Sequence, residues 1–185
     1  MEWIAIGIAA AVVLWLVIVY NRLVALRQTT NQAWADVDVQ LKQRHDLVPN
    51  LVETVKGYAG HERQTLAEVV AARNAAAAAH GPDEAGRAEA ALSGALGRLF
   101  ALAEAYPELK AAANFLELQR DLSDLENRIA AARRFFNNAV SEFNAAIEQV
   151  PAVLFAGALG FRARGFFELG ADERQVVEAP PRVAF

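Results

Sequence analysis

The sequence predicts an all-α protein in which one N-terminal transmembrane helix continues directly into an antiparallel bundle of four helices. Three observations support this prediction: an uncharged apolar run near the N-terminus, a hydrophobic stripe at heptad spacing after it, and a second, longer stripe toward the C-terminus. Alanine supplies much of the 55% hydrophobic fraction of the 185 residues. Because alanine favours helix more than any other residue, helix is the default expectation along the chain.

The apolar run, residues 3–20 (WIAIGIAAAVVLWLVIVY), contains no charged side chain. A helix of this length extends about 27 Å, close to the thickness of the hydrocarbon layer of a bilayer. Trp3 and Tyr20 place an aromatic side chain at each end, as membrane interfaces favour. A cleaved signal peptide is the alternative, but Glu2 occupies the position where a basic residue is expected. We therefore expect residues 1–21 to form a transmembrane anchor.

The charges beside this run predict its orientation. Arg22 and Arg27 follow the run, whereas no Lys or Arg precedes it. Basic residues are in excess on the cytoplasmic side of membrane-spanning helices. We therefore expect a single-pass protein of the cell membrane, with its N-terminus outside and its helical bundle in the cytoplasm.

A hydrophobic stripe continues from the anchor into the first helix of the bundle. Between Tyr20 and Lys56 there is no glycine, and Pro49 is the one proline. The stripe keeps its phase across Pro49, which predicts a kinked rather than a broken helix. The proline nevertheless removes the hydrogen bond to the His45 carbonyl, at a cost of about 3 kcal/mol unless that bond is replaced. The members of the stripe are Trp34, Val37, Leu41, His45, Val48, Val52, Val55 and Ala59.

Turns divide the middle of the chain into two shorter helices. Gly57 and Gly60 mark the first predicted turn and, together with Pro49, are candidate hinges. A helical stretch over residues 61–79 then ends in a run of alanines followed by His-Gly-Pro-Asp, which predicts a stop and a restart. Another helix is expected from about 84 to 105, before a second proline boundary.

The last helix has the most regular pattern, because its apolar residues alternate three and four apart, as in a coiled coil. They are Phe115, Leu118, Leu122, Leu125, Ile129, Ala132, Phe136, Ala139, Phe143, Ala146 and Val150. The long, short, short, long order of helices predicts a four-helix bundle over residues 22–150. If Gly60 and Pro107 only kink the chain, the alternative is one long helical hairpin.

The C-terminal segment, residues 151–185, begins with a proline and is too apolar at its start to be a free tail. We weigh three places for it: across the open end of the bundle, at the lipid headgroups, or against a neighbouring subunit. We expect residues 171–185 to form an extended tail. The candidate membrane-interface or oligomer contacts are Trp3, Tyr20, Arg22, Arg27, Phe155, Phe161, Arg162, Arg164, Phe166 and Phe167.

No constellation in the sequence indicates enzyme chemistry. Bundles that hold di-iron centres need Glu-x-x-His pairs, and none occurs. His61-Glu62 begins like the zinc-protease signature, but Thr65 occupies the position of the second histidine. The three serines lack the spaced partners of a catalytic triad, and the glycines form no phosphate-binding loop. We therefore expect a non-enzymatic protein with no metal site and no cofactor.

Composition narrows the partners further. The net charge of -4 provides no basic face that could neutralise a row of phosphates, so we expect no nucleic-acid partner. The absence of cysteine excludes disulfides and thiolate zinc sites. His45 lies on the apolar stripe, where it is either a core or hinge histidine or a switch that responds to pH or to a ligand.

Long stretches of the sequence resemble a known family. They are residues 20–27 (YNRLVALR), 33–58 (AWADVDVQLKQRHDLVPNLVETVKGY) and 61–69 (HERQTLAEV), with shorter agreements at 106–110, 114–116, 126–129, 132–133, 138–140, 143–144, 160–161 and 166–168. In these residues the chain resembles the LemA family. The resemblance implies a bacterial single-pass inner-membrane protein with a helical-bundle domain and no established enzymatic activity. The chain departs from the family in the phenylalanines at 135, 136 and 143 and in its alanine-rich middle.

The function expected from these features is that of a non-enzymatic scaffold. We expect a bundle anchored in the lipid bilayer that forms a homo-oligomer by lateral assembly and organises or shapes the membrane. The alternative is an adaptor or accessory subunit that binds a membrane-protein partner such as a protease or a signalling protein.

Overall fold

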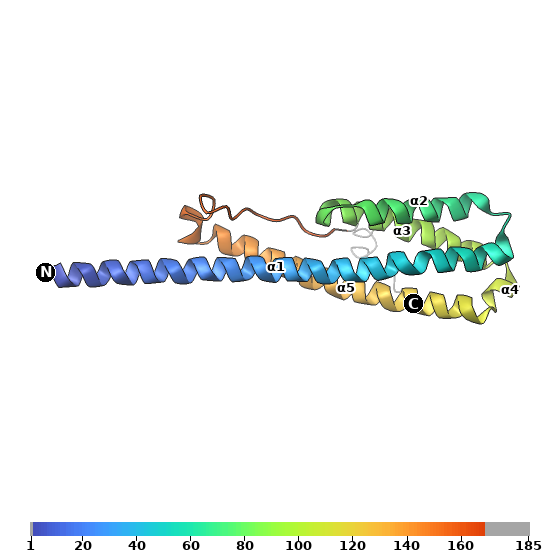
Figure 1. Cartoon of the computed structure of the whole chain (residues 1–185), viewed down its shortest axis with the longest axis horizontal. Helices are drawn as coiled ribbons and strands as arrows, with labels where there is room; N and C mark the ends of the chain where they lie inside the picture. Colours follow the sequence, from blue (N-terminus) through green and yellow to red (C-terminus); the bar gives the residue numbers. More distant parts are fainter. Residues whose placement is uncertain (1, 169–185) are drawn as a thin grey trace, which may run out of the picture. The chain divides into compact units, whose positions relative to one another are not determined.

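The computed structural model describes residues 2–168 (Figure 1). Its elements are α1 (Glu2–Ala59), α2 (Arg63–Ala78), α3 (Gly81–Ala103), α4 (Pro107–Lys110), α5 (Ala113–Glu148) and the 3₁₀ turn η1 (Ala152–Leu154). Residues 2–168 contain no strand, so the all-α prediction is confirmed. The extended tail predicted over residues 171–185 lies outside the described residues.

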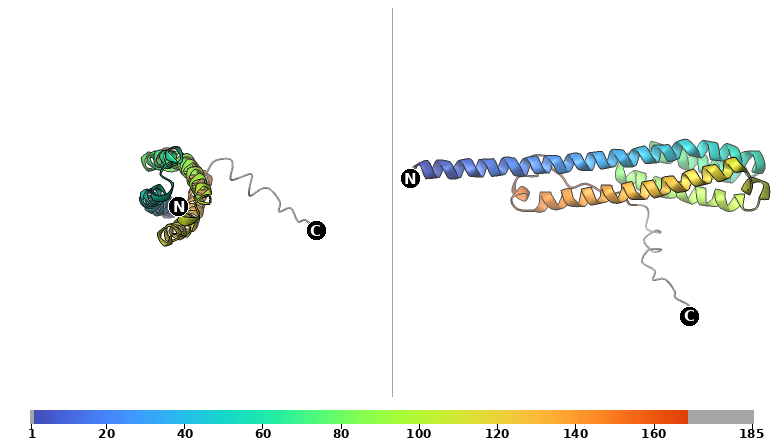
Figure 2. Two further views of the ribbon diagram at one scale, coloured as in Figure 1. Left: turned by 90° about the vertical axis from the view of Figure 1, so that its right-hand side faces the viewer. Right: turned by 90° about the horizontal axis from the view of Figure 1, so that it is seen from below.

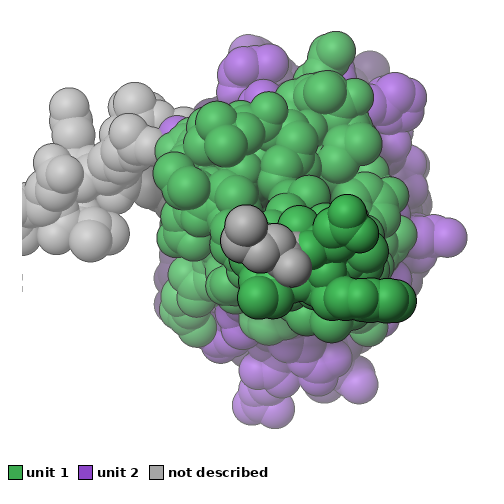
Figure 3. Space-filling model, turned by 90° about the vertical axis from the view of Figure 1, so that its left-hand side faces the viewer, with its two compact units in different colours: residues 1–37, 132–165 green, residues 38–131, 166–185 purple. Residues whose placement is uncertain are grey.

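The chain divides into two compact units (Figure 3). Unit 1 contains the residues before position 38 and residues 132–165, and unit 2 contains residues 38–131 and the segment that begins at Phe166. α1 and α5 contribute residues to both units. The predicted domain boundaries at residues 21 and 150 stay predictions.

α1 is one uninterrupted helix that contains Pro49. The continuity predicted between the apolar N-terminal run and the first bundle helix is therefore confirmed. Arg73 of α2 donates a hydrogen bond from Nε to the His45 carbonyl at 3.1 Å. Pro49 has no N–H to offer that carbonyl, so the arginine replaces the missing helical donor.

The core of unit 2 is built from four helices. α1 supplies Val48, Leu51 and Val55, α2 supplies Leu66 and Val69, α3 supplies Leu92, Leu96 and Leu99, and α5 supplies Phe115 and Leu122. Because α1 and α2 share one core, the turn at Gly60 reverses the chain, and the alternative of one long kinked hairpin is wrong. α2 and α3 lie side by side (Figure 2). The short helix α4 and the turn after it separate α3 from α5.

The end of the described chain packs closely on α3 inside unit 2. A Cβ atom at Gly86 would lie 2.1 Å from the carbonyl oxygen of Glu168, so any larger residue would collide with the backbone there. Phe167 is fully buried beside this contact. A glycine in the middle of a helix thus marks a close approach of a second stretch of backbone.

The core of unit 1 lies between the N-terminal part of α1, the end of α5 and the segment that follows it, which run side by side in Figures 1 and 2. Its buried residues are Leu23, Phe143, Ala146, Ile147, Ala152, Ala156 and Phe161. The rings of Trp34 and Phe136 are in tilted contact, 5.2 Å apart between centroids, and the Thr30 hydroxyl donates to the Leu26 carbonyl at 2.9 Å.

Candidate functional site

The N-terminal part of α1 is the one stretch among residues 2–168 that is long and apolar enough to cross a membrane, and none of it is buried. Trp3 through Ile18 expose large apolar side chains on every side of the helix. The first residue of α1 with a fully buried side chain is Leu23, one turn after Tyr20. The continuous exposed apolar surface of α1 therefore ends where the packed core of unit 1 begins.

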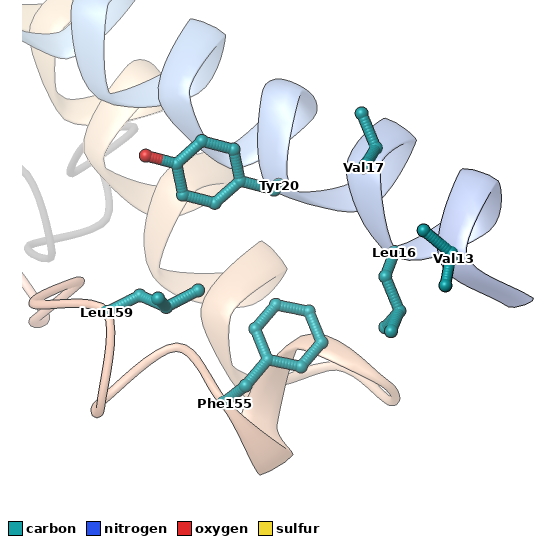
Figure 4. A pocket seen from close by; sticks show the side chains of 6 residues that line it. All are labelled: Val13, Leu16, Val17, Tyr20, Phe155 and Leu159. Atoms are coloured by element: carbon teal, nitrogen blue, oxygen red, sulfur yellow. The ribbon is translucent and has the colours of Figure 1, made fainter.

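A groove in unit 1 lies at this transition (Figure 4). It has a volume of about 340 Å³. α1 contributes Val13, Leu16, Val17 and Tyr20, and the segment after α5 contributes Phe155 and Leu159. Hydrocarbon side chains and aromatic rings line the groove, so it offers contact surface for an apolar occupant.

Phe161 holds the segment after α5 against α1. Its side chain is buried, with ring centroids 5.8 Å from Tyr20 in an edge contact and 6.4 Å from Phe143. The guanidinium of Arg27 lies 5.0 Å from the centre of the Phe161 ring. Aromatic edge contacts and a cation over a ring each add to the apolar burial of this side chain.

Arg164 fixes the irregular segment that follows Phe161. The side chain of Asn144 pairs with its backbone, accepting from the Arg164 N–H at 2.9 Å and donating to its carbonyl at 3.0 Å. Arg164 Nη1 donates to Asn31 Oδ1 at 2.6 Å, and its guanidinium lies 5.8 Å from the centre of the Phe143 ring. Burial, and then the charge of Arg27, lowers the pKa of Arg164 from its ordinary value.

The structure brings together part of the predicted contact set. Tyr20, Arg27, Phe155, Phe161 and Arg164 form one neighbourhood in unit 1. The other predicted members are Arg22 and Arg162, which are exposed in unit 1, Trp3, which is exposed at the start of α1, and Phe166 and Phe167, which belong to unit 2. Phe161 and Phe167 are interior side chains, and Phe166 is partly exposed.

The three candidate hinges lie in different local structures. Pro49 and Gly57 are inside α1, and Gly60 is in the turn before α2. A Cβ atom at Gly60 would lie 3.0 Å from the Lys56 carbonyl oxygen, which explains a small residue at the helix end. Motion at these positions stays a prediction.

A buried ionic network in unit 2 joins α1 to α3. Arg44 Nη1 donates to Glu89 Oε2 at 2.9 Å, and His45 Nε2 lies 2.5 Å from Glu89 Oε1. All three residues are less than a tenth exposed. Both oxygens of the buried carboxylate are therefore occupied by side chains of the facing helix.

Arg44 extends this network to a third helix. Its Nη2 atom lies 2.7 Å from Glu126 Oε1 of α5 and donates to Ser93 Oγ of α3 at 2.8 Å. One guanidinium thus bridges α1, α3 and α5. Removal of either partner of a buried pair leaves an uncompensated charge, so the packing of these helices is sensitive to the loss of either residue.

Sequence reasoning singled out His45 in this network but missed Arg44 and Glu89. The spacing of both residues from apolar residues of their own helices could have identified them. Arg44 lies three residues after Leu41, and Glu89 lies three residues before Leu92, so each occupies a position on the apolar face of its helix. A charge on each of two apolar faces indicates a buried pair.

A second groove in unit 2, of about 370 Å³, has polar or charged residues at most positions of its lining and is here called the polar groove. It is lined by Gln43, Asp46, Leu47, Asp121, Asp124, Leu125 and Arg128. The residues 2–168 hold no group of three or more His, Cys, Asp or Glu placed to bind a metal ion, and this groove is no exception. Its three aspartates against one arginine favour a cationic occupant.

Comparison with known proteins gives a family and several relatives. A model described as the LemA family matches residues 33–185. Magnetosome protein MamQ of Magnetospirillum gryphiswaldense is 25% identical to this chain over an alignment 185 residues long. The alignment covers 85% of this chain and 68% of that protein. Magnetosome proteins MamQ 1 and MamQ 2 of Paramagnetospirillum magneticum are each 23% identical over 175 residues, 80% of this chain and 64% of theirs. The chain spans about two thirds of the length of these relatives.

Proposed function

The chain belongs to the LemA family, and we propose that it is a non-enzymatic scaffold anchored in a bacterial inner membrane, where copies assemble laterally and organise or shape the bilayer. The membrane-spanning segment is the N-terminal part of α1. Arg22 and Arg27 follow that segment, which supports an orientation with the N-terminus outside and the bundle in the cytoplasm.

One observation carries this proposal: the apolar surface of α1 is unburied along its whole N-terminal stretch and leads into an apolar groove in unit 1. Apolar surface in water costs about 25 cal/mol for each Å². Side chains such as Ile4, Leu14 and Ile18, which are more than half exposed, therefore require lipid or another protein around them.

The most enclosed charges among residues 2–168 support a structural rather than a chemical role. Both carboxylate oxygens of Glu89 are bound, one by Arg44 and the other by His45. Arg44 also binds Ser93 of α3 and Glu126 of α5. A catalytic acid or base needs a free position toward a substrate. Arg44, His45 and Glu89 instead bind one another, which connects the helices that carry them.

Self-assembly is tested by the mass of the full-length protein in mild detergent. Size-exclusion chromatography with light scattering, corrected for bound detergent, should give several copies per particle at micromolar protein concentration. A strict monomer across the whole concentration range would contradict lateral assembly.

The polar groove of unit 2 favours a second candidate, an adaptor that binds a basic segment of a membrane-protein partner. Asp46, Asp121 and Asp124 would pair with the basic side chains of that segment. Affinity purification from native membranes should then recover a partner with the wild-type chain and lose it with Asp121→Asn and Asp124→Asn together. Recovery of the chain alone counts against the adaptor.

A further inference from the structure

We propose that residues 149–161, here called the apolar turn, insert into one leaflet of the bilayer beside α1, and that a lipid acyl chain occupies the groove between them. This inference rests on the membrane anchor of the proposed function. It adds a second lipid contact of a different kind, since the apolar turn is not part of a membrane-spanning helix. The apolar turn reads QVPAVLFAGALGF and carries no charged side chain.

The side chains of the apolar turn point outward to an unusual extent for apolar residues. Val150 and Leu154 are each 80% exposed, and Val153 and Leu159 are each 50% exposed. Phe155 and Leu159 meet Val13, Leu16 and Val17 of α1 around the groove (Figure 4). The exposed surface of the turn is thus continuous with the surface that the anchor presents to lipid, and burial of both in hydrocarbon removes them from water together.

The backbone of the apolar turn is prepared for an environment without water. Every unsatisfied N–H group in hydrocarbon costs several kcal/mol, which excludes most irregular chain from the bilayer. Here the N–H groups of residues 153–156 and 159–161 all donate to carbonyl groups within residues 149–157, at distances of 2.7 to 3.2 Å. Pro151 has no N–H group to satisfy. The turn therefore enters the leaflet with most of its donors already paired.

The groove gives the depth of insertion. Its lining on α1 extends from Tyr20 back to Val13, a rise of about 10 Å along the helix. With Tyr20 at the interface, where tyrosine is favoured, the turn reaches about one third of the way through a hydrocarbon layer of roughly 30 Å. The insertion is confined to the leaflet next to the core of unit 1.

Charges around the apolar turn match lipid headgroups. Arg162 and Arg164 follow it directly, and Arg22 and Arg27 follow the membrane-spanning part of α1. Residues 143–165 contain one acidic residue, Glu148, and residues 15–35 contain none. This excess of arginine at the edge of the apolar surface favours anionic lipid headgroups.

A lipid chain fits the groove better than α1 of a second copy does. Close approach of two membrane helices requires small residues at the contact. The groove is instead lined by bulky side chains. Within the apolar run, residues 3–20, the small residues all lie nearer the N-terminus, among residues 5–11.

Spin labels test the depth of the apolar turn. The chain has no cysteine, so Leu154→Cys, Leu14→Cys and Val70→Cys each introduce a single labelling position on an exposed side chain. The full-length variants are reconstituted in liposomes of phosphatidylethanolamine and phosphatidylglycerol. Collision of the label with oxygen, which concentrates in hydrocarbon, is compared with collision with a water-soluble nickel chelate. Leu14 is the reference for lipid and Val70, on α2, is the reference for water.

The label at Leu154 should resemble that at Leu14, with an oxygen-to-nickel ratio several-fold above that at Val70. A Leu154 label that the nickel chelate reaches as readily as it reaches Val70 contradicts the inference. A label that neither reagent reaches places the turn against protein and contradicts it too. If the label at Leu14 is itself in water, the anchor and hence the proposed function fail. If the Leu154 label lies in lipid but the mass measurement gives a monomer, lateral assembly is contradicted and the insertion of the apolar turn stands.

Discussion

Arg73 Nε donates a hydrogen bond to the backbone carbonyl of His45, which is the acceptor that Pro49 leaves without a helical donor. The bond joins α2 to α1 at the one position where the ladder of α1 lacks an N–H group. It explains how a proline is accommodated inside a 58-residue helix.

This pairing makes the effect of Arg73 depend on Pro49. Arg73→Ala should lower the free energy of unfolding by about 2 kcal/mol, because it leaves a partly buried carbonyl unpaired after a charge-assisted bond is lost. In a Pro49→Ala background the helical N–H is restored, so the same substitution should cost much less. Urea unfolding of the full-length protein in mild detergent, followed by circular dichroism, measures the double-mutant cycle. Equal costs in both backgrounds would show that the bond does not replace the helical donor.

The buried network predicts a large effect at Glu89. Glu89→Ala leaves Arg44 with Glu126 and without its most enclosed partner, and should destabilise the protein by about 3 kcal/mol in the same unfolding measurement. The exposed pair of Glu53 and Lys56 is the control, since Glu53→Ala should cost less than about 1 kcal/mol.

Replacement of both buried partners separates charge from packing. Arg44→Met with Glu89→Leu should recover most of the stability lost in Glu89→Ala, since apolar residues of similar size remove both buried charges together. The Glu126 carboxylate, which is about half exposed, is then solvated by water. A cost for Glu89→Ala as small as that for Glu53→Ala would mean that the network is open to water.

Gly86 tests the close approach of the last described residues to α3. Gly86→Ala would place a Cβ atom 2.1 Å from the Glu168 carbonyl oxygen, so this segment must move away and expose Phe167. Hydrogen exchange of residues 166–168 should become faster. Gly97→Ala, on the same helix with no atom within 4 Å of its Cβ, should leave that exchange unchanged and stabilise α3 by about 0.5–1 kcal/mol. Unchanged exchange in both variants would contradict the contact.

Phe161 tests the attachment of the apolar turn to α1. Phe161→Ala removes a buried ring that contacts Tyr20, Phe143 and Arg27, and should cost about 3 kcal/mol or more. Trypsin should also cleave faster after Arg162. Phe135, which is 54% exposed, provides a control of the same residue type, and its alanine variant should change stability by less than about 0.5 kcal/mol. Similar losses of stability for the two variants would show that Phe161 does not attach the apolar turn to α1.

The period of the apolar residues predicted most of the fold. In the seam of the last helix, Phe115, Leu122, Phe136 and Phe143 are all buried, and so are Val37, Val48 and Val55 of the first stripe. A helix that buries one face must place its apolar residues at this spacing, so the spacing alone predicts which side packs. Val150, the last position of the predicted seam, is exposed because α5 ends at Glu148.

Features that depend on which helices face each other could not be predicted in the same way. The pairing of Arg44 with Glu89 and of Arg73 with the His45 carbonyl joins residues 45 and 28 positions apart, and their separation is set by packing rather than by local pattern. The assignment of Phe161 and Phe167 to two different units depends on where the chain turns after α5. Composition could not distinguish these two phenylalanines from the exposed Phe166.

The most direct test of the membrane scaffold is a count of copies in the membrane itself. Full-length protein extracted with its surrounding lipid into polymer-bounded discs and imaged by electron microscopy should show several helical bundles side by side in each disc. Discs that hold one bundle each, at every ratio of protein to lipid, would contradict the account.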